Sequence, residues 1–68
     1  MRKKMDERLH IGTSQREDFT IHFFRLPDGR YEVEQYCGGN LDRVYDDLHK
    51  DDLIHIFGTW FQVDHISW

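Results

Sequence analysis

Five histidines and one cysteine are the side chains of this sequence that could bind a transition metal: His10, His22, His49, His55, His65 and Cys37. Structural zinc sites combine cysteine and histidine ligands that are paired at short spacing, such as C-x2–4-C with H-x3–5-H. A chain with a single cysteine lacks that combination. We therefore predict no metal site and no cofactor, and a small metal-binding module stays only as an alternative.

Groups that could perform acid–base catalysis are few. His22 and Glu34 are expected to be neighbours on adjacent strands, but a surface ion pair of this kind is common and contributes little free energy. The segment Gly38-Gly39-Asn40 is too short for a phosphate-binding loop, and no serine or cysteine follows the pattern of an activated nucleophile. A chain of 68 residues also has little room for a substrate pocket. We predict that the protein is not an enzyme.

Aspartates are concentrated between residues 42 and 52: Asp42, Asp46, Asp47, Asp51 and Asp52. On the helix predicted there, they would form a solvated face that keeps the domain soluble. Alternatively, they would form an acidic array directed at a basic groove, as in inhibitors that imitate the phosphates of DNA. We favour the first interpretation. The formal net charge of −4 also argues against direct binding of nucleic acid, so a nucleic-acid-binding module is another alternative only.

Aromatic residues make up 15% of the chain, more than so small a domain can readily bury. We expect the surplus to bind a protein partner, through a surface formed by Phe24, Tyr36, Phe57 and Trp60. Phe57 and Trp60 flank Gly58-Thr59 on a face predicted to point away from the helix. A second copy of the chain could cover that face, so we also expect a homodimer.

Two runs of alternating apolar and polar residues, 19–26 and 31–37, flank the segment Pro27-Asp28-Gly29. Proline suits the first turn position and glycine the left-handed conformation that follows, so a three-residue hairpin loop is predicted, with Gly29 at positive φ. Such a loop fixes the register. It places Arg25 opposite Tyr31, Phe23 opposite Val33, Ile21 opposite Gln35, and Phe19 opposite Cys37.

The second half of the chain is expected to begin with a helix. Asn40 is a good N-cap, and the residues Leu41, Val44, Tyr45 and Leu48 follow helical spacing until Asp51-Asp52 interrupt it. Residues 53–57 and 60–66 flank Gly58-Thr59 and predict a type II′ hairpin. An alternative interpretation extends the helix to Phe57 and keeps a single final strand.

The expected fold is therefore α+β: a small antiparallel sheet (ββα followed by a strand or hairpin) with one helix packed on one face. Residues 1–18 are expected to form a flexible or edge-strand segment, and residues 19–68 a single α+β domain. No apolar run is long enough to span a membrane and no secretory signal is present, so we expect a cytoplasmic protein without membrane contact.

In outline, the combination of hairpin, helix and acidic surface resembles the small phage inhibitors of uracil-DNA glycosylase. That resemblance implies the alternative function, an acidic DNA-mimic inhibitor of a DNA-binding protein. The function predicted from the residues is a small protein-binding protein, an inhibitor or adaptor of the sort that phages and mobile elements encode. It would act through the aromatic surface of its sheet.

Overall fold

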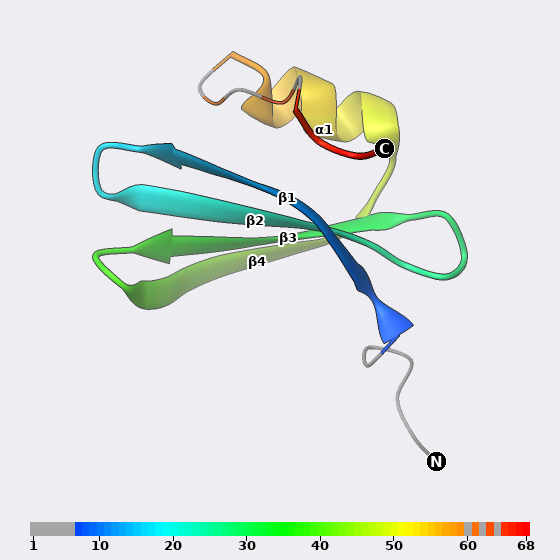
Figure 1. Ribbon diagram of the computed structural model, residues 1–68, viewed down its shortest axis with the longest axis horizontal. Coiled ribbons are helices and arrows are strands. Elements are labelled where there is room, and N and C mark those ends of the chain that lie inside the picture. The colour runs from blue at the N-terminus through cyan, green and yellow to red at the C-terminus, as the bar shows by residue number, and fades with distance from the viewer. Residues whose placement is uncertain (1–6, 60, 62, 64) are drawn as a thin grey trace.

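The computed structural model describes residues 7–59, 61, 63 and 65–68. Four strands form one antiparallel sheet in the order β1-β2-β3-β4: β1 (Leu9–Arg16), β2 (Phe19–Arg25), β3 (Tyr31–Cys37) and β4 (Asn40–Leu48). One helix, α1 (Lys50–Phe57), follows β4 and lies across one side of the sheet (Figure 1). The protein is thus a small α+β fold with an antiparallel sheet and one helix on one face, as predicted.

The hairpin formed by β2 and β3 has the predicted register. Arg25 pairs with Tyr31, Phe23 with Val33, Ile21 with Gln35, and Phe19 with Cys37. The loop is closed by a hydrogen bond from the Leu26 amide to the Arg30 carbonyl, 2.8 Å long, which leaves the three predicted residues between them. Gly29 has a φ of 92°, the left-handed value that the turn requires.

The helix predicted from Leu41 is wrong, because residues 40–48 form strand β4. Gly38 and Gly39 both take positive φ and make a tight two-residue turn from β3. The apolar residues have helix-like spacing because β4 contains two register shifts, each of which inserts an extra residue. As a result Tyr45 and Leu48 face the core, while Leu41 and Val44 face the other side of the sheet.

The hairpin predicted for residues 53–66 is also wrong at its first strand, because residues 50–57 are helical. Asp51 and Asp52 lie in the first turn, where they favour the helix dipole, and the Asp52 carboxylate accepts a 3.0 Å hydrogen bond from the His49 amide. Leu53 and Phe57, one turn apart, are the buried pair that fixes α1 on the sheet. Gly58 ends the helix and donates its N–H to the Ile54 carbonyl.

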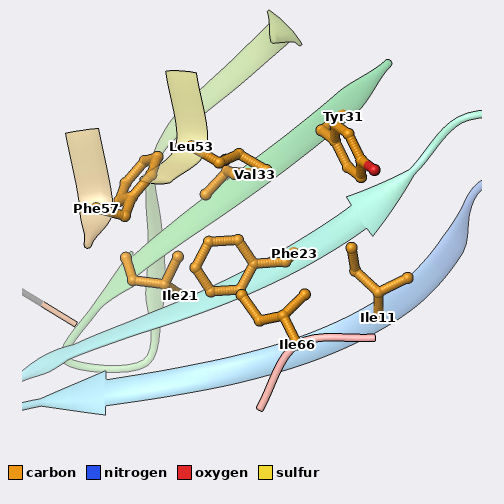
Figure 2. Packing of buried hydrophobic residues seen from close by; sticks show 8 residues of the cluster. All are labelled: Ile11, Ile21, Phe23, Tyr31, Val33, Leu53, Phe57 and Ile66. Atoms are coloured by element: carbon orange, nitrogen blue, oxygen red, sulfur yellow. The ribbon is translucent and has the colours of Figure 1, made fainter. Parts of the chain in front are cut away.

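The core lies between the sheet and α1, with a contribution from the C-terminal segment (Figure 2). Leu53 and Phe57 project from the helix toward Ile21, Phe23 and Val33 of the central strands. The remaining buried apolar members are Ile11, Tyr31 and Ile66. Among the described residues beyond the helix, 61, 63 and 65–68 form no strand, so the final strand predicted there is not observed in them.

The C-terminal segment, residues 65–68, returns along β1 on the same side as α1 (Figure 1). The Ser67 amide donates to the Ile11 carbonyl at 3.0 Å, and the His65 ring nitrogen Nε2 donates to the Thr13 carbonyl at 2.7 Å. These two bonds cover part of the free edge of β1. Among the described elements, no helix or strand covers the side of the sheet turned away from α1.

Candidate binding surface

The open side of the sheet, here called the outer face, carries side chains from all four strands. The strand register brings these residues together: His10, Thr13, His22, Phe24, Glu32, Glu34, Tyr36, Leu41 and Val44. They alternate along β2 and β3 with the core residues Ile21, Phe23 and Val33. The surface is therefore a direct product of strand pairing, and rigid elements hold its side chains in place.

Arg8, just before β1, organises one half of the outer face. Its guanidinium lies 3.9 Å from the centre of the Phe24 ring, a cation–π contact. It also forms ion pairs with Glu32 at 3.2 Å and with Glu34 at 2.9 Å. Burial by itself lowers the pKa of Arg8, but the hydrogen bonds and charges of Glu34 and Glu32 raise it, and the pKa is raised overall.

The other half of the outer face is a continuous set of ring contacts. The His10 ring lies 5.3 Å from Phe24 and 5.4 Å from His22, and His22 lies 5.4 Å from Tyr36 in an edge-to-face arrangement. The Tyr36 hydroxyl then donates a 3.2 Å hydrogen bond to Glu34. Contacts therefore run in a closed circuit, from Arg8 through the four rings to Glu34 and back to Arg8.

The charge of Glu34 changes the chemistry of Tyr36. Its negative charge opposes formation of the tyrosinate and raises the pKa of the Tyr36 hydroxyl; desolvation and the hydrogen bond to Glu34 act in the same direction, whereas Arg8 opposes them. Tyr36 is therefore held as a neutral hydrogen-bond donor, half-buried at the centre of the surface.

Two of the four predicted partner-binding residues lie on the outer face. Phe24 and Tyr36 are half-buried there, on neighbouring strands. Phe57 does not lie on the outer face. It is 3% exposed and packs in the core beside Phe23, with the two ring centres 5.8 Å apart. The prediction placed it on an outer strand face, whereas helical geometry turns it inward with Leu53. Trp60 lies outside the described residues.

The five aspartates do not share a helix face as predicted. Asp42, Asp46 and Asp47 belong to β4, whereas Asp51 and Asp52 begin α1. Asp42 accepts a hydrogen bond from the Gln35 side chain, and Asp47 forms an ion pair with Arg30. Asp46 and Asp47 line a hollow of about 530 Å³ that also includes Glu7, Asp28 and Glu32. Glu32 belongs to both surfaces, so the acidic hollow borders the outer face.

The candidate metal ligands are spread over the molecule. His10 and His22 lie together on the outer face, whereas His55 is on α1 and Cys37 ends β3. Within residues 7–59, 61, 63 and 65–68, no group of three or more histidine, cysteine, aspartate or glutamate side chains is placed to hold a metal ion. His22 and Glu34 are cross-strand neighbours, as predicted. In the described contacts, however, Glu34 binds Arg8 and Tyr36, and His22 contacts His10 and Thr13.

Sequence reasoning placed Leu41 and Val44 of this surface on a helix. It also missed three further members: Arg8, His10 and Thr13. They reach it because β1 pairs with β2 through the two-residue loop Glu17-Asp18, where Glu17 takes positive φ. A register shift between His10 and Gly12 breaks the period of two, so alternation does not reveal a strand of this length. Unbroken pairing from the Glu17-Asp18 loop would set Ile11 opposite Phe24, and it is the register shift that brings His10 there instead.

No family model, curated protein or solved structure matches this chain. In the part of the chain that the structure describes, no helix combines the length and the apolar character needed to cross a bilayer.

Proposed function

We propose that the protein is a non-enzymatic binding domain, an inhibitor or adaptor, that docks a basic and partly apolar segment of another protein on its outer face. The observation that carries the proposal is the row of uncovered apolar side chains beside Tyr36. Leu41 is 54% exposed and Val44 45% exposed, on the face of the edge strand β4 that is turned away from the core. An apolar patch of this kind on a small domain is typical of an interaction site.

The order of the surface supports the same function. Arg8 is bound to Phe24 and to two glutamates, and Tyr36 is bound to Glu34 and packed against His22. Side chains that are already fixed lose little conformational entropy on binding, so more of the contact energy appears as affinity. Aromatic anchors such as Tyr36 also dominate the energy of many interfaces.

Charge favours a basic partner over a second copy of the chain. Glu32 and Glu34 outnumber Arg8 on the outer face, and the adjoining hollow contains Glu7, Asp28 and Asp46. Two such faces with a chain charge of −4 would repel each other on approach, whereas lysine and arginine side chains would be attracted. The basic segment thus replaces the homodimer expected from the sequence as the proposed occupant.

A random peptide library displayed on phage and selected on the immobilised full chain tests this proposal. We expect the selected peptides to combine lysine or arginine with aliphatic or aromatic residues. Fluorescence anisotropy of labelled peptides should then show a loss of about tenfold or more for Tyr36→Ala and for Val44→Lys. Ile56→Lys is the matched control, because Ile56 is 44% exposed on α1 and should leave the affinity within about twofold.

Any of four results would overturn the proposal. Selected peptides could be acidic, or Ile56→Lys could cost as much affinity as Val44→Lys. Sedimentation equilibrium could show a dimer of the parent that Val44→Lys dissociates, which would make a second copy the occupant. Finally, Asp46→Asn and Asp47→Asn could weaken binding while Tyr36→Ala does not. That result would assign the function to the acidic hollow instead.

A further inference from the structure

Three polar side-chain atoms converge at one point of the outer face, near the β1 edge. His10 Nε2 lies 3.3 Å from His22 Nδ1, and the Thr13 hydroxyl oxygen lies 2.9 Å from the first nitrogen and 3.2 Å from the second. The three residues come from β1 and β2, where Thr13 pairs directly with His22. The atoms thus form a nearly equilateral triangle that is accessible from outside.

This triangle has the dimensions of one face of a tetrahedral metal site. When zinc–nitrogen bonds are about 2.0–2.1 Å long, two ligand atoms at the tetrahedral angle are roughly 3.3 Å apart. Hydrogen bonds can also join the three atoms, because the Thr13 hydroxyl can donate to one imidazole and accept from the N–H of the other. A cation above the triangle would accept a lone pair from each of the three atoms at once.

We propose that His10, His22 and Thr13 form a site for a divalent transition metal of the zinc and copper class. The two imidazoles are the ligands, the Thr13 hydroxyl is a third contact, and water completes the coordination. Imidazole nitrogen selects copper, nickel and zinc over magnesium and calcium, which prefer oxygen. The site differs from a structural zinc centre, which uses four protein ligands, so its metal would exchange with solution.

The surroundings support the assignment. Phe24 packs against His10 and Tyr36 packs against His22, so the orientation of both rings is fixed before a metal arrives. Arg8, which lies over the Phe24 ring, is neutralised by Glu32 and Glu34. The inference does not depend on the proposed binding of a basic segment, because the ligands are different atoms of the surface.

Isothermal titration of the tag-free full chain with zinc chloride and with copper sulfate tests the site. We expect one ion per chain, tighter binding of copper than of zinc, and no measurable binding of magnesium. His10→Asn and His22→Asn should each weaken zinc binding by at least about tenfold, because either change removes one of two imidazole ligands. His55→Asn is the matched control on α1 and should leave the affinity within about twofold.

A spectroscopic measurement identifies the ligands independently of affinity. Electron paramagnetic resonance of the copper-loaded parent should show hyperfine coupling to two imidazole nitrogens, and to one in either single variant. Near-ultraviolet circular dichroism verifies that the variants remain folded. Binding that survives in the double variant of His10 and His22 would overturn the site. Equal zinc affinities of the parent and of this double variant would also overturn it, because the three side chains would then form only a hydrogen-bonded cluster.

Discussion

Arg8 is the residue on which the outer face depends most, because it neutralises a carboxylate that the fold has buried. The Glu32 side chain is only 6% exposed and that of Arg8 is 24% exposed. A buried carboxylate without its partner is costly, since desolvation is then uncompensated. The exposed ion pair between Arg30 and Asp47 lacks this property, because both of its side chains are about half or more in solvent.

We therefore expect Arg8→Met to lower the free energy of unfolding by about 3 kcal/mol, because it leaves Glu32 buried without its partner. Arg30→Met is the matched control and should change it by less than about 1 kcal/mol. Urea denaturation followed by circular dichroism measures both. Equal effects of the two substitutions would show that Glu32 does not need the guanidinium.

Tyr36 gives a prediction about pH. Because the charge of Glu34 raises its pKa in the folded state, the neutral form is favoured by folding. The resulting contribution to stability is complete below the ordinary tyrosine pKa and is lost as the pH rises through the raised value. Glu34→Gln should move the Tyr36 pKa back down toward the ordinary value. Titration of the Tyr36 ring resonances by NMR in the parent and in the variant measures the change, and an unchanged midpoint would contradict the coupling.

At the scale of the elements, the hairpin of β2 and β3 could be predicted and β4 and α1 could not. The hairpin is specified locally, since Pro27 and Gly29 select the loop and the alternation on both sides agrees with it. In β4, two inserted residues change the strand period of two into spacings of three, which imitate a helix. In α1, Ile54 and Ile56 are apolar but exposed, so the apolar residues before Gly58-Thr59, which suggested a strand, do not all face the core.

The same contrast explains how much of the candidate site was accessible from sequence. Phe24 and Tyr36 could be placed because they belong to the locally specified hairpin. Arg8 and His10 could not, because their position depends on β1, whose register shift interrupts the alternation of apolar and polar residues. Phe57 was misplaced for a related reason. It is buried because α1 places it one turn after Leu53, on the same side of the helix.

Gly29 tests the hairpin loop directly. Its φ is 92°, and a Cβ atom built on it meets nothing within 4 Å, so a substitution there causes backbone strain without a steric clash. We expect Gly29→Val to lower the free energy of unfolding by about 1–3 kcal/mol, and Gly29→Asn to cost less, because asparagine tolerates positive φ. The midpoints of chemical denaturation measure both changes. If valine and asparagine have the same small effect, the loop does not need the left-handed conformation.

At the scale of the whole molecule, the two edges of the sheet are protected in different ways. The edge of β1 is partly covered by the C-terminal segment through Ser67 and His65. The edge of β4 has two register shifts and carries aspartates, among them Asp47 at positive φ. Bulges and charges of this kind discourage pairing with another chain, which is the usual hazard of a free edge. Pairing at either edge is therefore disfavoured, which is consistent with the outer face that we propose for binding.

The C-terminal segment has a consequence for the order of events in folding. Each hairpin of the sheet closes a short loop, whereas the bond between His65 and Thr13 joins residues 52 positions apart in the chain. Closing a long loop costs more entropy, so we expect the hairpins to form in the transition state and the segment to dock after it. Ile66→Val should then raise the unfolding rate about fivefold, for a loss of about 1 kcal/mol, and leave the folding rate unchanged.

Stopped-flow chevron plots measure both rates, with Ile21→Val as the matched control in the hairpin, where folding itself should slow. A slower folding rate for Ile66→Val would place the segment in the folding nucleus instead. If the expected order holds, residues 65–68 set how long a folded molecule persists, while the hairpins set how quickly it forms. The lifetime of the fold could then be lengthened or shortened at Ile66 without changing either the binding surface or the speed of folding.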